Sequence, residues 1–136
     1  MDFYFLGIFL FGGFVGWIID TFDRSIDRGH FVDGSALHLP FLPIYGFGAV
    51  LLISARPILP SEIALQFLSI GILLGALEYL GGVFCVRVLK RRLWNYKTKW
   101  NLNGHTDLAH AFAWGVLGLL FLYIEPTLFH VYQNII

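Results

Sequence analysis

Four runs of apolar residues alternate with polar stretches along the chain. The runs cover residues 3–19, 41–55, 63–86 and 108–124. A helix needs about 20 apolar residues to cross a bilayer, and the third run clearly reaches that length. The second run is short, so we expect a tilted or partly re-entrant helix there. The pattern predicts four membrane helices.

Composition supports this interpretation. The chain has 136 residues, of which 57% are hydrophobic and only 13% are charged, against about 25% charged in soluble domains. Its mean hydropathy is +0.72. A soluble domain of this size could not bury so much apolar surface, so we expect lipid around it. We predict one transmembrane domain over residues 1–136, an all-α integral membrane four-helix bundle.

The two halves of the chain share a weak internal repeat. Gly34 to Gly48 and Gly104 to Gly118 are both separations of fourteen residues, each between a loop and a predicted span. Two helical hairpins of the same orientation would be related by an axis along the membrane normal. Chance spacing in a glycine-rich chain is the other interpretation.

The basic residues predict the orientation. Eight of the nine flank the first and third loops, and Arg56 alone lies on the other side. The positive-inside rule then places loops one and three in the cytoplasm. With four spans, both termini lie outside the cytoplasm. The eight are Arg24, Arg28, Arg87, Lys90, Arg91, Arg92, Lys97 and Lys99.

The third span carries one charge, Glu78, within a stripe of small residues. The stripe recurs at helical spacings of three and four, which lets a neighbouring helix approach closely. Glu78 lies nine residues before Arg87, about 13 Å along a helix axis. A carboxyl inside a span is either a functional site for a proton, cation or substrate, or a hydrogen bonder that holds the bundle together. The stripe consists of Gly71, Gly75, Glu78, Gly82 and Cys85.

The end of the first span is a second candidate site. The helix could continue to Arg28, with Gly29 as its C-cap. Asp20, Arg24 and Arg28 would then lie on one face. They either line an entrance on the cytoplasmic side or form an ordinary solvated helix end.

A polar stretch before the fourth span is the third candidate. Asn103 and His105 could hold the phosphate of a lipid headgroup near a helix N-terminus. Thr106 or Asp107 is the expected N-cap of that span. His110, inside the span, is more typical of a bonded core residue than of a ligand. No spacing of acidic residues, histidines or cysteines matches a metal site, and we expect neither a metal nor another cofactor.

Aromatic and proline residues mark the ends of the spans. Trp94, Tyr96 and Trp100 are expected at headgroup level, where amphipathic rings are enriched. Pro126 is expected to end the fourth helix, because proline lacks the amide hydrogen that continues a helix. A short amphipathic tail should follow.

Taken together, these motifs resemble a family of small bacterial membrane proteins catalogued as ABC-transporter type IV, or CmpB-like permeases. In the first half the likeness is carried by Gly16, Trp17, Asp20, residues 27–29, Gly34 and the run Pro43–Ala49. In the second half it is carried by residues 77–79, Gly82, residues 94–96, residues 101–104, Trp114, Gly115, Leu117 and Gly118. This chain departs from the pattern at Asp20, where the family has Glu, at Asp27, where it has Asn, and at Asn95, where it has Asp.

The resemblance implies a transport role and extends the candidate site. It adds Tyr45, Trp94 and Asn95, which lie in its motifs, to the expected substrate-binding residues. The full expected set is Glu78, Asp20, Arg24, Arg28, Tyr45, Trp94, Asn95, Asn103 and His105. Any ATPase would be a separate polypeptide, because the chain has no nucleotide-binding motif.

We therefore expect a multi-pass protein of the bacterial inner membrane, a permease-like subunit with a polar pocket facing the cytoplasm. A membrane enzyme acting on a lipid headgroup is one alternative, with Glu78 or Asp20 as the acid-base group and Arg28 and His105 on the phosphate. A non-catalytic assembly subunit is the other. The balance favours a protein that is not an enzyme. The expected partners are membrane lipid, a second copy or another membrane subunit, and no nucleic acid.

Overall fold

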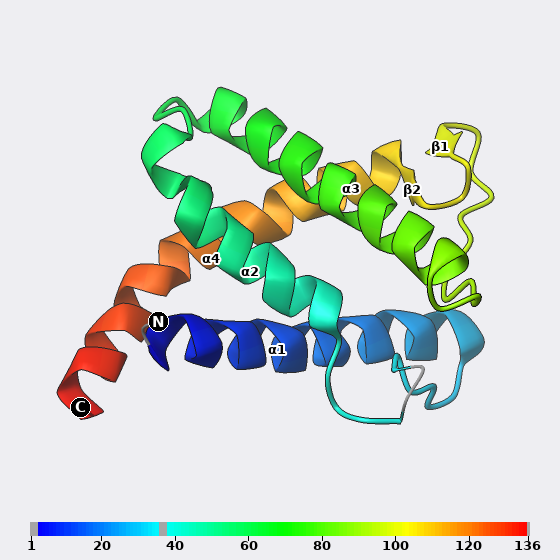
Figure 1. The fold of residues 1–136 in the computed structure, drawn as a ribbon, viewed down its shortest axis with the longest axis horizontal. Helices are drawn as coiled ribbons and strands as arrows, with labels where there is room; N and C mark the ends of the chain where they lie inside the picture. The colour runs from blue at the N-terminus through cyan, green and yellow to red at the C-terminus, as the bar shows by residue number, and fades with distance from the viewer. Residues whose placement is uncertain (1–2, 36–37, 136) are drawn as a thin grey trace. The chain divides into compact units, whose positions relative to one another are not determined.

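A computed structural model describes residues 3–35 and 38–135, and the described chain is mostly helical (Figure 1). Its long helices α1, α3 and α4 are apolar and long enough to cross a membrane, while Pro43–Ile58 forms a shorter apolar helix. The expected all-α fold therefore needs one correction, which is a small antiparallel sheet. The elements are α1 Phe3–Arg28, α2 Pro43–Ala55, the 3-10 helix η1 Arg56–Ile58, α3 Ile63–Arg87, β1 Asn101–Leu102, β2 Thr106–Asp107 and α4 Leu108–Ile135.

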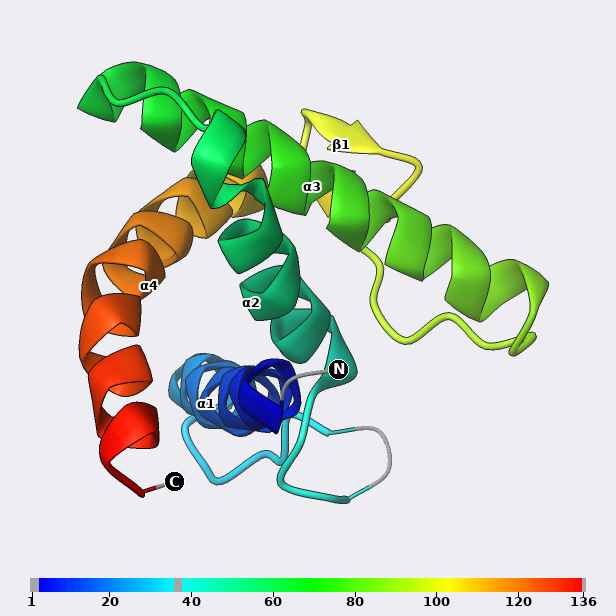
Figure 2. The same cartoon turned by 60° about the vertical axis from the view of Figure 1, so that its left-hand side comes forward.

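The prediction that Pro126 ends the last helix is wrong. Pro126 lies inside α4, which continues to Ile135. Proline removes only one helical hydrogen bond, the one that its own amide would donate to Leu122, and a helix can bend instead of stopping there. Figure 2 shows α4 curving along its length in that way.

The chain divides into two compact units, residues 1–51 and 52–136. In the first unit, α1 packs its glycines against the segment that enters α2. The ring of Phe41 covers Gly13 and the ring of Tyr45 covers Gly16, so a Cβ at either glycine would collide with an aromatic ring. The Leu42 amide also donates to the Gly13 carbonyl at 2.9 Å. Gly13 and Gly16 therefore allow α1 and the segment that enters α2 to approach closely.

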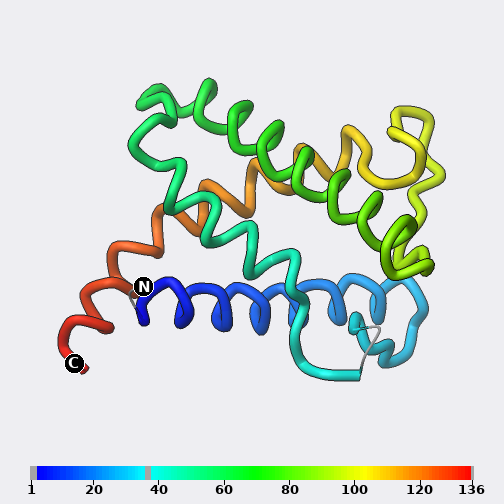
Figure 3. Tube along the Cα trace, viewed as in Figure 1, coloured from blue at the N-terminus to red at the C-terminus, as the bar shows by residue number. Residues whose placement is uncertain are grey.

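After α1, residues 29–35 fold back against its last turns (Figure 3). The helix ends at Arg28, and Gly29 follows with a positive φ of 68°, as expected for a C-cap. The Gly34 amide donates to the Thr21 hydroxyl at 3.0 Å, and the Trp17 indole donates to Asp33 at 2.8 Å. These bonds fix the loop on the helix that precedes it.

In the second unit, α3 and α4 pack through small residues. A Cβ at Gly71 would lie 2.8 Å from the Ala111 carbonyl, and one at Gly115 would lie 2.6 Å from the Phe67 ring. All five residues of the predicted stripe on α3 are buried, whereas Ile72 on the other side is 73% exposed. The stripe is thus confirmed as the packed face of the helix.

The far end of the second unit is held by an ion pair. Arg56 of η1 contacts Glu125 of α4, whose side chain is almost fully buried. The same end carries the start of α3, where the Glu62 carboxylate accepts from the amides of Ala64 and Leu65 and caps the helix. The opposite end of α3, at Arg87, carries the polar segment described next.

Candidate functional site

The chain reverses direction after α3 and returns along it. Val88 donates to the Phe84 carbonyl and Arg91 donates to the Cys85 carbonyl, while Lys90 adopts a positive φ of 56°. These are the features of a helix end closed by a left-handed residue. Residues 93–107 then run back toward the middle of α3 and end in the hairpin formed by β1 and β2.

The hairpin turns at two consecutive residues in the left-handed region, Asn103 with φ 53° and Gly104 with φ 74°. Asn tolerates this region better than most residues and Gly enters it without strain. The Asn101 side chain accepts from the Gly104 amide at 2.8 Å, and the Gly104 carbonyl accepts from Tyr96 at 3.0 Å. We call residues 93–107 the hairpin segment.

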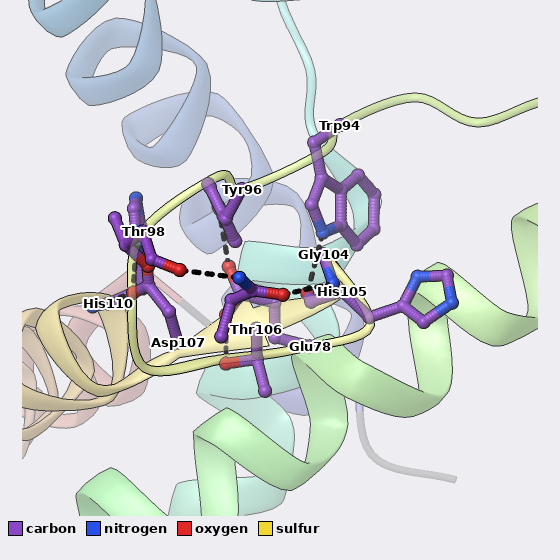
Figure 4. A network of polar contacts seen from close by, with 10 residues as sticks. Glu78, Trp94, Tyr96, Thr98, Gly104, His105, Thr106, Asp107 and His110 are labelled. Carbon is purple, nitrogen blue, oxygen red and sulfur yellow. Dashed lines mark hydrogen bonds and ion pairs between the residues drawn. The ribbon is translucent and has the colours of Figure 1, made fainter.

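Glu78 is the point at which the hairpin segment is attached to α3. Its carboxylate accepts a hydrogen bond from the Tyr96 hydroxyl at 2.8 Å and one from the Thr106 hydroxyl at 2.7 Å (Figure 4). The Trp114 side chain of α4 is a third hydrogen-bonding neighbour. Only 4% of Glu78 is exposed. A buried carboxylate requires such partners, because an unpaired one would be costly away from water.

All three donors to Glu78 are uncharged. Among the described residues, no Lys or Arg bonds to this carboxylate. The His110 ring is the neighbouring side chain that acts on this carboxylate through its charge. The carboxylate is buried inside the second unit, and its partners come from the hairpin segment and α4.

A second carboxylate, that of Asp107 on β2, lies near Glu78 (Figure 4). It accepts from the Thr98 hydroxyl, from the His110 amide and from the His110 ring, each at 2.7 Å. The bond to the His110 amide is the N-cap of α4, as predicted for Asp107. Burial alone raises the pKa of Asp107, but the hydrogen bonds from Thr98 and His110 outweigh burial and hold it below its usual value.

Tyr96 and His110 connect the two carboxylates. Their rings stack with centroids 3.7 Å apart and an interplanar angle of 21°. Tyr96 therefore touches Glu78 through its hydroxyl and His110 through its ring face. His110 in turn bonds Asp107, so a chain of contacts, with a ring stack in its middle, joins Asp107 to Glu78.

His105 is buried but faces away from this network (Figure 4). Its ring lies against Gly82, where a Cβ would come within 2.5 Å of Nδ1, and it packs edge-on against Tyr79. Nδ1 is buried without a hydrogen-bond partner in the described structure. Burial and the charge of Arg92 both lower the pKa of His105, so the ring stays neutral.

The structure brings together only part of the predicted site. Trp94 is linked to Glu78 through the hairpin segment. Its indole donates to the His105 carbonyl at 2.7 Å, and the next residue, Thr106, donates to Glu78. Asn95 and Asn103 share one partner, the Arg92 guanidinium. In the other unit Asp20 pairs with Arg24 at 2.7 Å. There, Arg28 ends α1 and Tyr45 packs on Gly16.

The hydroxyl donors to Glu78, Tyr96 and Thr106, were not predicted from the sequence. Tyr96 was assigned to the headgroup level, and Thr106 was considered only as a cap. The signal that could have found them is the requirement that a buried carboxyl have hydrogen-bond donors, which the following polar stretch supplies as hydroxyl groups. Within the described residues, no three His, Cys, Asp or Glu side chains are placed to hold a metal ion.

Comparison with known proteins identifies the family but no close relative. No curated protein and no solved structure matches the chain significantly. The sequence model of the family described as "Putative ABC-transporter type IV" (ABC_trans_CmpB) matches residues 7–136. That match, with three helices able to span a membrane, fits a membrane protein related to transport. The chain belongs to the ABC_trans_CmpB family.

Proposed function

We propose that this protein is a permease-like subunit of the bacterial inner membrane, with a polar site at Glu78 that opens toward the cytoplasm. One observation carries the proposal. Glu78 is buried in a long apolar helix, and two of its donors come from the polar segment that follows this helix. Ionisable groups inside a span usually mark substrate or ion pathways when they are not purely structural.

The depth of Glu78 supports access from one side. Glu78 lies nine residues, about 13 Å, before Arg87, where α3 ends. The hairpin segment returns from that end and supplies the bonds from Tyr96 and Thr106 to the carboxylate. We therefore propose that a substrate reaches Glu78 from the cytoplasmic side, past the hairpin segment.

The hairpin segment has the geometry of a gate. Exposure of the Glu78 carboxylate requires the bonds from Tyr96 and Thr106 to break, since both donors lie over it. Each bond to a charged acceptor contributes about 1.5 to 3 kcal/mol, so release is costly but within reach of a bound substrate. A cation or a hydrogen-bond donor could replace the two hydroxyl groups, and we propose that class of substrate.

Asp20, Arg24, Arg28 and Tyr45 belong to the first unit, so they remain predictions from the sequence and are not part of the site proposed at Glu78. Energy would come from a separate ATPase or from a gradient, because the sequence has no nucleotide-binding motif. The lipid-headgroup enzyme gains no specific support, because the His105 ring turns away from Glu78 (Figure 4).

Comparison of solute content in cells tests the proposal. A strain that lacks the gene would be complemented with wild type, Glu78→Gln or an empty vector, and the small molecules that it accumulates would be compared by mass spectrometry. We expect at least one cationic or hydrogen-bond-donating solute to change with wild type but not with Glu78→Gln. Equal profiles for wild type and empty vector, or full activity in a folded Glu78→Gln variant, would refute the transport site.

A further inference from the structure

The segment between α3 and the hairpin carries an unusual concentration of positive charge. Residues 87–100 contain six basic side chains and no acidic one. All six residues are exposed. We call residues 87–100 the basic segment, and its cations are Arg87, Lys90, Arg91, Arg92, Lys97 and Lys99.

None of these cations has a carboxylate partner in the described part of its unit. The four acidic residues there are already engaged in other contacts. Glu62 caps α3, Glu78 and Asp107 bind the hairpin segment, and Glu125 pairs with Arg56. Exposed side chains of like sign repel one another unless an external anion compensates them.

Arg92 differs from the other five, because its head is held in place by neutral acceptors. One of its terminal nitrogens donates to the Asn95 side chain at 3.2 Å and to the Asn103 carbonyl at 3.1 Å. Among the described residues, its other N–H groups donate no hydrogen bond to the protein. A guanidinium fixed in this way is prepared for a planar, bidentate contact with phosphate.

Apolar side chains accompany the charges. Val88, Leu89 and Trp100 are 60%, 51% and 68% exposed. The Lys99 amine also lies 5.4 Å from the centre of the Trp100 ring. Basic residues interleaved with exposed aliphatic and indole side chains favour the boundary between headgroups and acyl chains over open water.

We propose that the basic segment is a docking surface for anionic phospholipid headgroups, with Arg92 as its fixed phosphate ligand. The occupant follows from charge complementarity, because the segment follows directly on a membrane-length helix, so the nearest large anion is the bilayer surface. The inference goes beyond the proposed transport role and does not depend on it. It requires only that α3 lie in a membrane.

Lipid retention in mixed nanodiscs provides the test. The full chain would be reconstituted in nanodiscs in which one fifth of the lipid is phosphatidylglycerol and the rest is phosphatidylcholine. Native mass spectrometry would then count the phospholipids that stay bound after mild delipidation. We expect phosphatidylglycerol to be enriched several-fold, and the enrichment to fall as sodium chloride rises. No preference over phosphatidylcholine would overturn the proposal.

Two matched variants test the role assigned to Arg92. Lys97→Gln removes a cation of the same segment that makes no bond to the protein, and it should lower retention about fivefold or less, the usual effect of one charge near an anionic surface. Arg92→Gln should lower retention clearly more than Lys97→Gln does. Arg92→Lys keeps the charge but lacks the planar guanidinium, so its retention should rise only to that of Lys97→Gln. Equal losses of retention for Arg92→Gln and Lys97→Gln would overturn the role of Arg92 as the fixed phosphate ligand.

Two controls keep these outcomes decisive. Excess inorganic phosphate should not displace phosphatidylglycerol from wild type. Displacement, with thermal stabilisation by phosphate alone, would identify a free-phosphate site and refute the lipid surface. If Arg92→Gln does not fold, the double variant Lys97→Gln/Lys99→Gln tests the docking surface without it. This variant should retain less phosphatidylglycerol than wild type, and unchanged retention would refute the docking surface.

Discussion

The attachment of the hairpin segment to α3 makes a specific prediction about Glu78 and Thr106. The Thr106 hydroxyl donates to one carboxylate oxygen of Glu78 at 2.7 Å, and the Tyr96 hydroxyl donates to the other at 2.8 Å. Glu78→Leu leaves these two hydroxyl groups, and the Trp114 side chain, without their partner. A buried unpaired donor costs about 1 to 3 kcal/mol, so the two hydroxyl groups alone should lower the unfolding free energy by about 2 to 6 kcal/mol.

The amide in Glu78→Gln behaves differently. Its oxygen accepts from one hydroxyl, and its NH₂ group donates to the other after that hydroxyl rotates. Both pairs persist as neutral hydrogen bonds, which are weaker by about 1 kcal/mol each than bonds to a charged acceptor. Glu78→Gln should therefore remain folded while it loses the carboxylate that the proposed site needs.

A double-mutant cycle separates this contact from general disruption. Thr106→Val should destabilise the wild type by about 1.5 to 3 kcal/mol, because a bond to a charged acceptor is lost. In the Glu78→Leu background the same change should be neutral or stabilising, since it removes an unpaired donor. Unfolding free energies in mixed micelles, followed by tryptophan fluorescence, would give the coupling. Additive effects within about 0.5 kcal/mol would refute the hairpin attachment.

Three further predictions concern topology, packing and pH. In a cysteine-free background, an impermeant maleimide added outside intact cells should label Ile58→Cys but not Lys97→Cys, and the reverse would invert the proposed orientation. Gly82→Leu should reduce folded protein recovered in detergent far more than Ile72→Ala does, because the His105 ring leaves no room at Gly82; similar recoveries would argue against the packed stripe. The folded pKa of Asp107 is lowered, so its contribution is complete above the unfolded pKa of about 3.9 and is lost as pH falls through the folded pKa. Unfolding free energy should therefore drop below about pH 4, and Asp107→Asn should flatten that drop; an identical pH profile in this variant would contradict it.

The helices were predictable because their signal is local. An apolar run of membrane length specifies a helix whatever surrounds it, and the runs at residues 63–86 and 108–124 match α3 and the first part of α4. The buried stripe on α3 was equally predictable, because glycines and a carboxyl at spacings of three and four share one face. The N-cap of α4 was narrowed to Thr106 or Asp107 for a similar reason, since capping depends on a few neighbouring residues, and Asp107 makes the capping bond.

The hairpin segment was not predictable from such local signals. Its position depends on which donors reach a carboxyl on another element, and Tyr96 lies eighteen residues after Glu78 with no periodic relation to it. Tyr96 also has the amphipathic character expected at an interface, and the same ring suits both places. Pro126 shows the opposite case, in which a local signal to stop is overcome because the helix bends and continues past the proline (Figure 2).

We propose above all that the hairpin segment covers the Glu78 carboxylate on the cytoplasmic side. Reaction with a water-soluble carbodiimide and an amine, applied to inside-out vesicles and read by peptide mass spectrometry, tests it most directly. Asp23, an exposed acid on α1, provides the internal reference. We predict that Glu78 reacts at least about tenfold more slowly than Asp23 in wild type, and faster in Tyr96→Phe, which lacks one covering bond worth more than 1.4 kcal/mol. A wild-type Glu78 that reacts as fast as Asp23 would show that nothing covers this carboxylate and would contradict the account.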